Sequence, residues 1–215
     1  MTTVISHMSV SLDGFVAGPA QSLENPLGVG GPALHQWHFD ADLPGHDVDA
    51  SFRDQLLGRG DAYVMGRNMF GPVRGAWETW APEGEPVEWR GWWGDEPPYH
   101  APVFVLTHHP RPPLELQGTT FFFVTDGVES ALAQAREAAG PAGTVDVAGG
   151  ASTVQQVIRA GALDELVLDI APVLLGSGER LLDGLEDPGL AVIEAVHSPY
   201  ATHVRYRVGR PPSDA

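Results

Sequence analysis

The chain has 215 residues, of which 12 are basic and 28 acidic, so its formal net charge at pH 7 is −16. All the basic residues are arginines, and the absence of lysine excludes Schiff-base aldolases, pyridoxal-phosphate enzymes and Walker-type phosphate loops, each of which needs a lysine amine. The absence of cysteine excludes zinc ribbons, thiol proteases, iron–sulfur proteins and disulfide-stapled modules.

Short runs of β-branched and aromatic residues alternate along the chain with longer segments whose apolar residues recur three or four positions apart. In chain order, strands are predicted at residues 3–10, 62–65, 103–107, 120–125, 145–148 and 165–170. Helices are predicted at residues 48–57, 128–139 and 152–160, each followed by a glycine that can end it. This alternation predicts an α/β fold with a mostly parallel central sheet flanked by helices.

The last part of the chain and two long segments have a different character. Extended runs at residues 191–197 and 203–208, separated by a Ser-Pro-Tyr turn, predict an antiparallel C-terminal hairpin. Residues 19–44 and 71–102 are rich in glycine and proline and fit no regular element. The second segment contains five tryptophans between residues 77 and 93, which we expect to form either a lid that stacks on a planar ligand or a dimer contact.

One domain is expected to hold residues 1–210, with residues 211–215 as a tail, because roughly 200 residues is the upper end of one ordinary domain. No apolar stretch approaches the ~20 residues that cross a bilayer, and the start lacks the features of a signal peptide, so a cytoplasmic location without membrane contact is expected. The acidic charge predicts no nucleic-acid partner, because phosphate backbones are held by clustered basic residues.

Three junctions share one design, in which a buried strand runs into a turn that carries groups able to hold an anion. Residues 64–70 contain Gly66, which permits a sharp turn, and Arg67, which supplies a planar cation. Residues 106–111 combine a threonine, two histidines and an arginine. Residues 147–153 contain two glycines and then hydroxyl side chains at a predicted helix start. Taken alone, each junction is also compatible with an ordinary turn.

The order and spacing of these junctions, together with Ser-Leu-Asp-Gly-Phe-Val-Ala-Gly at residues 11–18, resemble the dihydrofolate reductase superfamily. The closer resemblance is to the reductase domain of bacterial riboflavin biosynthesis and its stand-alone relatives. Its most specific parts are the Ala-Gly-Gly-Ala-Ser-Thr turn at residues 148–153 and Pro-Val-Leu-Leu-Gly-Ser-Gly-Glu at residues 172–179. The Gly-Trp-Trp-Gly stretch at residues 91–94 is similar to the stand-alone subgroup.

The resemblance implies a three-layer dihydrofolate-reductase-like fold and a reductase that transfers a hydride from NADPH to a small-molecule pteridine- or pyrimidine-type ring. It places the nicotinamide beside Met8, Val16, Ala17 and Gly18. The phosphates and adenosine are implied to lie near Gly66, Arg67, Asn68, Thr107, His108, His109, Arg111, Gly149, Gly150, Ala151, Ser152 and Thr153. Related stand-alone reductases are commonly dimers, so a homodimer is expected.

The reaction also needs a proton, and the resemblance implies a carboxylate on the helix after the first mobile loop. That region contains Asp40, Asp42, Asp47, Asp49 and Asp54. Asp49 shares a helical face with Phe52 and Leu56, so it is expected to point inward, but the spacing does not decide between Asp47 and Asp49, and an acidic helix start is commonly solvated. Asp13 is a third candidate, although an Asp-Gly pair is also simply a turn former.

Two hypotheses from different classes remain open at this point. The first is an NADPH-dependent reductase, with the acceptor and the preference for NADPH over NADH undecided. The second is a non-catalytic NADPH- or pteridine-binding or regulatory protein on the same scaffold. No metal site is expected, because His35 and His38 have helical spacing but no third ligand of a suitable type accompanies them.

Overall fold

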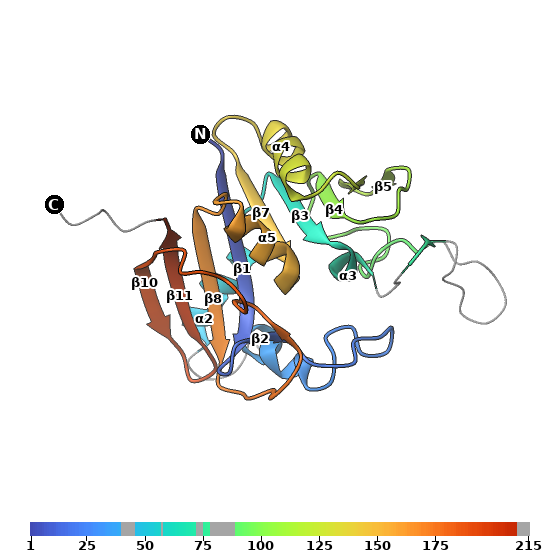
Figure 1. Ribbon diagram of the computed structural model, residues 1–215. Helices are drawn as coiled ribbons and strands as arrows, with labels where there is room; N and C mark the ends of the chain where they lie inside the picture. The colour runs from blue at the N-terminus through green and yellow to red at the C-terminus, as the bar shows by residue number, and fades with distance from the viewer. Residues whose placement is uncertain (40–45, 57, 72–74, 78–88, 210–215) are drawn as a thin grey trace.

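The computed structural model describes residues 1–39, 46–56, 58–71, 75–77 and 89–209. Within these residues a nine-stranded sheet has the order β10-β11-β8-β1-β7-β3-β4-β6-β5 (Figure 1). The strands that run parallel to one another are β1 (Thr3–Ser11), β3 (Ala62–Gly66), β4 (Val103–Leu106), β6 (Thr119–Val124), β7 (Thr144–Gly149) and β8 (Glu165–Ala171). The antiparallel strands are β5 (Leu114–Leu116), β10 (Leu190–His197) and β11 (Thr202–Val208). The predicted mostly parallel sheet and its terminal hairpin are therefore confirmed.

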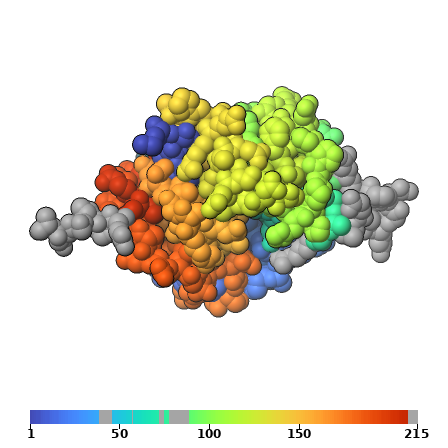
Figure 2. Space-filling view, turned by 45° about the horizontal axis from the view of Figure 1, so that its top comes forward, coloured from blue at the N-terminus to red at the C-terminus, as the bar shows by residue number. Residues whose placement is uncertain are grey.

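Helices cover both faces of the sheet, which makes three layers. On one face lie α4 (Val128–Ala139) and α5 (Ala151–Arg159); in α5, Val154, Val157 and Ile158 are spaced three and one apart and all are buried. Figure 2 shows the α4 side, with the region around α4 (yellow) between the β4–β6 region (lime) and the C-terminal strands (orange to red). On the other face, α2 (Asp47–Leu56) packs Phe52 against Val167. No helix in the described ranges has the length and apolar character needed to cross a bilayer.

Several short elements were missing from the sequence-based prediction. Residues 19–44 were expected to lack regular structure, and that expectation was wrong, because η1 (Gly31–His35) and α1 (Gln36–Phe39) lie within them. The prediction also omitted β5, the four-residue helix α3 (Arg67–Phe70), and the small antiparallel sheet of β2 (Phe15–Ala17) and β9 (Glu179–Arg180). Segments of two to five residues are too short to show a helical or strand period.

Some expectations fall on positions outside the described residues. These positions are Asp40, Asp42, Leu57, Trp80 and residues 210–215, which include the expected tail. The predicted helix at residues 48–57 corresponds to α2, whose described part ends at Leu56.

The central strands part at the carboxyl end of the sheet. β1 pairs with β8 over seven positions, from Ile5 to Ser11, but with β7 over only three, from Thr3 to Ile5. Beyond Ile5 the backbone ladder between β1 and β7 stops, and the Ser6 Oγ donates a hydrogen bond to the Val147 carbonyl at 2.8 Å. Ligands of open α/β sheets bind outside the carboxyl ends of the strands, where neighbouring connections diverge. The opening between β1 and β7 is such a position.

Candidate functional site

A cleft of about 930 Å³ lies at this opening and extends over the carboxyl ends of β1, β3, β4, β6 and β7. It brings together most of the residues that the resemblance assigned to the cofactor, although they come from segments up to 145 positions apart. Those lining it are Met8, Val16, Ala17, Gly66, Arg67, Asn68, Thr107, His108, His109, Gly150, Ala151, Ser152 and Thr153. The size is within the range of small-molecule sites, which is roughly 300–1,000 Å³.

The N-terminus of α5 opens into the cleft without a side-chain cap. Gly150 is the N-cap residue, no described side chain forms a capping hydrogen bond there, and a Cβ on Gly150 would meet nothing within 4 Å. The first amide groups of an α-helix have no acceptor within the helix, so they can bind an anion. Gly66 allows β3 to approach this turn closely, because a Cβ there would lie 2.6 Å from Thr153 Oγ1. The turn is therefore open to a phosphate group.

Arg67 supplies a cation in the same cleft. Its Nη1 donates a hydrogen bond to Thr107 Oγ1 at 3.2 Å, and its guanidinium carbon lies 3.2 Å from the centre of the Trp77 ring. Burial, with a smaller contribution from Arg111, lowers the pKa of Arg67 to about 10, so the group stays charged at neutral pH. Its Nε and Nη2 are buried and find no hydrogen-bond partner among the described residues. Two buried donor nitrogens of Arg67 thus have no partner among the described residues, as expected of a group that pairs with an anionic ligand.

Three of the expected cofactor residues do not line the cleft. Arg111 donates from Nη1 to the Trp89 carbonyl at 2.7 Å, and its guanidinium carbon lies 5.1 Å from the Trp77 ring centre, so it packs behind the aromatic residue that supports Arg67. Gly149 has φ +112°, and a Cβ there would lie 3.0 Å from Met8 Cε. Gly18 N–H donates to the Leu27 carbonyl at 2.8 Å. These residues shape the walls of the cleft from behind.

The tryptophan-rich segment contributes to the cleft. Trp92 and Trp93 line it. Trp89 Nε1 donates to the Phe70 carbonyl at 2.9 Å, which joins this segment to the end of α3. Trp77 Nε1 donates to the His109 carbonyl at 2.9 Å. Aromatic rings therefore border the cleft on the side of β3 and β4, as a lid over a planar ligand requires.

Two of the candidate proton donors lie away from the cleft. Asp47 is exposed at the first position of α2. Asp13 accepts hydrogen bonds from Ser11 Oγ at 2.6 Å and from the amides of Leu175 and Gly176 at 3.1 and 2.7 Å. The hydrogen bond from Ser11, with those from the two amides, lowers the pKa of Asp13 to about 2 against a partial opposing effect of desolvation. Asp13 is therefore an anion that ties two loops together.

Asp49 is fully buried, as its position on the helix predicted, but it points away from the cleft. Its Oδ1 lies 2.7 Å from His203 Nε2, and His203 Nδ1 lies 2.7 Å from Asp169 Oδ1. Asp169 Oδ2 in turn lies 2.8 Å from His7 Nε2. Only His7, at the other end of this chain of side chains, lines the cleft. Asp49 and the cleft are therefore connected through three intervening residues.

Asp146 is a cleft residue that sequence reasoning missed. It is 2% exposed in the middle of β7, and its Oδ2 has no hydrogen-bond partner in the described part of the chain. Burial raises the pKa of Asp146 to about 8, against a weaker opposing influence of Arg59, so the carboxyl is neutral at pH 7. A single acidic residue between Val145 and Val147 was the available signal, because a carboxyl on a buried strand needs a reason to be there.

His35 is a second residue that lines the cleft and has a shifted pKa. It lines the cleft at the end of η1, and its Nδ1 lies 3.2 Å from His38 Nε2. Burial, followed by the influence of His38, lowers the pKa of His35 to about 4, so the imidazole is neutral at physiological pH. Between them, Trp37 Nε1 donates to Ser9 Oγ at 3.1 Å and fixes this segment against β1. No group of three side chains among the described residues is arranged to hold a metal ion.

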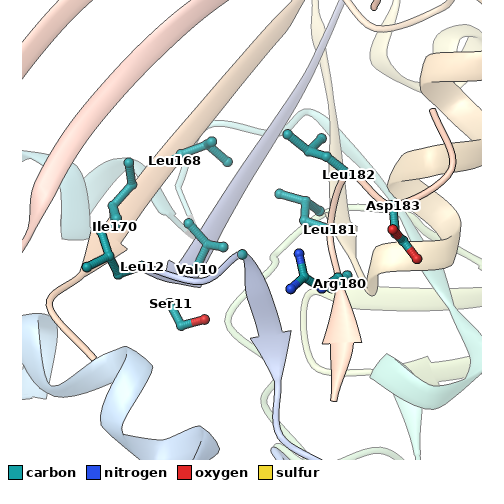
Figure 3. A pocket seen from close by; sticks show the side chains of 10 residues that line it. Val10, Ser11, Leu12, Leu168, Ile170, Arg180, Leu181, Leu182 and Asp183 are labelled. Carbon is teal, nitrogen blue, oxygen red and sulfur yellow. The ribbon is translucent and has the colours of Figure 1, made fainter. Parts of the chain in front are cut away.

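A smaller cavity of about 300 Å³ lies beyond the end of β1 (Figure 3). Its side chains are mainly apolar, with Val10 from β1, Leu168 and Ile170 from β8, and Leu181 and Leu182 after β9. Its cation, Arg180, already lies 4.6 Å from the ring centre of Phe15. Because few polar groups converge on this cavity, it lacks the features of a catalytic site.

Comparison with solved structures identifies the fold. One similar structure is that of a protein from Shewanella sp. PV-4 that is described as a riboflavin biosynthesis protein. It is 23% identical to this chain with a TM-score of 0.64, and the match covers 98% of this chain and 100% of that one. A second similar structure, from Thermotoga maritima, is that of a diaminohydroxyphosphoribosylaminopyrimidine deaminase/5-amino-6-(5-phosphoribosylamino)uracil reductase. It is 16% identical with a TM-score of 0.58. The match covers 96% of this chain but only 56% of the Thermotoga protein. Dihydrofolate reductase of Enterococcus faecalis, complexed with NADP(H), is 14% identical with a TM-score of 0.52 and 96% coverage of both chains.

No curated protein matches the chain. The model of the RibD C-terminal domain, however, matches residues 2–204, which is nearly the whole sequence. This match agrees with the structural similarity to dihydrofolate-reductase-like proteins and with a cleft at the end of the central strands. The chain therefore belongs to the RibD C-terminal domain family.

Proposed function

We propose that this protein is an NADPH-dependent reductase that transfers a hydride to a pteridine- or pyrimidine-type ring. The observation that carries the proposal is that two anion-binding features, the Arg67 guanidinium and the uncapped start of α5, open into the same cleft as a buried neutral carboxyl, Asp146, and a buried histidine, His7. The first pair suits the phosphates of a dinucleotide, and the second suits the polar edge of a heterocycle.

The residues of the cleft divide into two groups along its length. The amides of Ala151 and Ser152 would bind the pyrophosphate, while Arg67, Thr107 and the two following histidines would bind the adenosine 2′-phosphate. Met8 and the backbone of β2 would lie beside the nicotinamide. Arg67 would account for a preference for NADPH over NADH, because the additional phosphate would pair with its Nε and Nη2, which have no partner in the described part of the chain.

NADPH, when bound, would supply the hydride, and the protein residues would orient the acceptor and exclude water. Asp146, neutral because it is buried, can donate a hydrogen bond to a ring carbonyl or ring nitrogen. Trp92 and Trp93 can cover a planar ring. Candidate acceptors are 5-amino-6-(5-phosphoribosylamino)uracil and dihydrofolate, since reductases of both compounds share this fold.

Titration of the purified protein with NADPH tests the proposal directly. We expect quenching of tryptophan fluorescence, because Trp92 and Trp93 line the cleft and Trp77 stacks on Arg67. We also expect oxidation of NADPH, followed at 340 nm in absorbance, when one of the two acceptors is added. Absence of quenching at millimolar NADPH would contradict the proposal, and binding without turnover of either acceptor would favour a non-catalytic binding or regulatory protein instead.

We further propose that the protein is a homodimer that associates through β10. This strand is the edge of the sheet, and its Val192 and Ile193 side chains are 62% and 45% exposed. Edge strands carry unpaired backbone groups and, when apolar, are normally covered by another chain. A cytoplasmic location and the absence of nucleic-acid binding stay predictions.

Val192→Glu is expected to shift the protein from dimer to monomer at micromolar concentration, because two added carboxylates would face each other across the twofold axis. The measurement is size-exclusion chromatography with light scattering. Val29→Glu is a matched control, because Val29 is also a valine that is 62% exposed but lies far from β10 in the chain. A monomeric wild-type protein, or a dimer that both variants leave intact, would contradict this interface.

A further inference from the structure

A chain of alternating histidines and aspartates runs through the layer between α2 and the sheet and ends in the cleft. Asp49 comes from α2, His203 from β11, Asp169 from β8 and His7 from β1. The three successive contacts, in that order, are 2.7, 2.7 and 2.8 Å, and the side chains are at most 1% exposed. A fourth contact of 3.5 Å joins Asp49 Oδ2 to His46 Nε2, which is too long for a hydrogen bond.

We propose that His7 donates the proton in the reduction, and that Asp169, His203 and Asp49 position it for this role. This inference rests on the reductase activity proposed above. In the step, the carbon of an acceptor C=N bond gains a hydride from the reduced nicotinamide, which is thereby oxidised. The nitrogen gains a proton from the His7 imidazolium, which becomes neutral. The products are NADP⁺ and the amine, and solvent returns one proton to His7.

His7 meets the geometric requirements of a proton donor. It is the member of the chain that lines the cleft, and its Nδ1 has no hydrogen-bond partner in the described ranges. Its Nε2 lies against Asp169 at ion-pair distance, although the angle there is not that of a hydrogen bond. One ring nitrogen is therefore held against Asp169, while the other is buried beside the cleft and has no hydrogen-bond partner among the described residues. This is the arrangement in which a carboxylate orients a catalytic imidazole.

The neighbouring side chains His203 and Asp49 influence the charge of Asp169. Both nitrogens of His203 lie 2.7 Å from a carboxyl oxygen, an arrangement that favours the ring with a proton on each nitrogen. Burial alone lowers the pKa of His203, but hydrogen bonds to Asp169 and Asp49 outweigh burial and raise it. Burial likewise opposes ionisation of Asp169, and its contacts with His203 and His7 outweigh that effect and lower its pKa. Asp169 thus presents a carboxylate to His7.

Several other titratable groups lie on the elements packed around His7. The ring of Phe52 on α2 separates it from part of that helix, with ring centres 6.4 Å apart. The titratable side chains of the surrounding segments are Asp169 of β8, His203 of β11, Asp49 of α2, His46 immediately before α2, His35 of η1, His38 of α1 and Asp146 of β7. Asp146 is the alternative proton donor, because it is neutral and lines the same cleft.

The kinetics of two variants decide whether His7 or Asp146 is the proton donor. With NADPH and either dihydrofolate or 5-amino-6-(5-phosphoribosylamino)uracil, we expect His7→Gln to lower kcat by about 10²- to 10⁴-fold. The dissociation constant of this variant for NADPH should stay within about threefold of the wild-type value, since a group that acts only in the transition state does not contribute to ground-state binding of the cofactor. His197→Gln, a control at an exposed histidine of β10, should not change kcat. Wild-type kcat in His7→Gln, with turnover lost in Asp146→Asn, would overturn the assignment.

The positioning role of Asp169 has a pH signature. We expect Asp169→Asn to move the alkaline limb of the pH–rate profile to lower pH by about one unit, because an imidazolium without its facing carboxylate loses its proton more readily. If Asp169→Asn does not fold, Asp49→Asn tests the same chain from its far end. A purely structural role would lower the rate equally at all pH values, and that result would overturn the positioning role.

A readout without turnover distinguishes this inference from the proposed function. In ¹⁵N spectra of the histidine side chains of the NADP⁺-saturated protein, unreactive folate or 5,6-diaminouracil should shift the Nδ1 signal of His7 and leave that of His197 unchanged. Failure of NADPH or NADP⁺ to bind would contradict the proposed function itself. Cofactor binding with no change at His7 at saturating concentrations of both rings would overturn only the assignment of His7.

Discussion

Asp146→Asn is expected to stabilise the protein increasingly as the pH is raised from 4 to 8. Burial raises the pKa of Asp146 from 3.8 to about 8 in the folded state. Below pH 3.8 the carboxyl is protonated in both the folded and unfolded chains, so it has little effect on the difference between them. Between the two values the unfolded chain loses the proton and the folded chain keeps it, so stability falls as the pH rises and levels off above pH 8.

The magnitude follows from about 1.4 kcal/mol per pKa unit, which gives an upper estimate of about 6 kcal/mol for the increase in the free energy of unfolding above pH 8. The gain should be smaller, because a buried asparagine leaves polar groups of its own without partners. Urea unfolding of the wild type and the variant at several pH values measures it. Asp126→Asn, at an exposed aspartate, is the control and should show no such pH dependence. Parallel pH profiles for wild type and Asp146→Asn would contradict the expectation.

A carboxyl that destabilises the folded chain at neutral pH indicates a functional role for that position, because an apolar side chain there would be more stable. The rest of β7 around Asp146 is apolar, with Val145 and Val147 fully buried. The variant is therefore expected to gain stability and to lose affinity for the acceptor ring at the same time.

Arg67→Gln is expected to raise the dissociation constant for NADPH by roughly 10- to 100-fold. Hydrogen bonds to charged groups contribute about 1.5–3 kcal/mol each. Arg67 has two donor nitrogens, Nε and Nη2, without a partner among the described residues. The dissociation constant for NADH, which lacks the 2′-phosphate, should change much less. Tryptophan fluorescence titrations with both cofactors measure the ratio of the two constants.

Arg136→Gln serves as the control for this experiment, because Arg136 lies on α4 and donates to the Ala162 carbonyl, away from the cleft. It should leave both dissociation constants unchanged. If Arg67→Gln weakens NADPH and NADH equally, Arg67 acts through the shared part of the cofactor and the basis for selectivity would be wrong. Increasing the salt concentration should weaken NADPH binding to the wild type more than to Arg67→Gln.

Periodicity identified the long elements because their burial repeats with a regular spacing. The six parallel strands and the three long helices were predicted from apolar patterns, and the terminal hairpin from two extended runs and a turn. The short elements β2, β5, β9 and α3 were missed, because their formation depends on partners elsewhere in the chain. β2, for example, pairs with β9, more than 150 positions later.

The candidate cofactor residues came from local motifs, and most of them line the cleft because a strand that ends in a glycine turn places its next residues at the carboxyl edge of the sheet. Arg111 shows the limit of that reasoning. Its position after β4 is the one that the motif predicts, but only the folded chain shows that its guanidinium lies behind Trp77 and contacts the Trp89 carbonyl.

The amino-acid sequence by itself determined the α/β class, the strand ends that line the cleft, and the exclusion of lysine and cysteine chemistry, because these follow from composition and local pattern. Only the tertiary structure brought the buried histidines and aspartates together. His7, Asp49, Asp169 and His203 are separated by up to 196 positions in the chain, and no local pattern relates them. They meet because α2 and β11 pack against β8 and β1, and burial then alters the charge of each group through its neighbours.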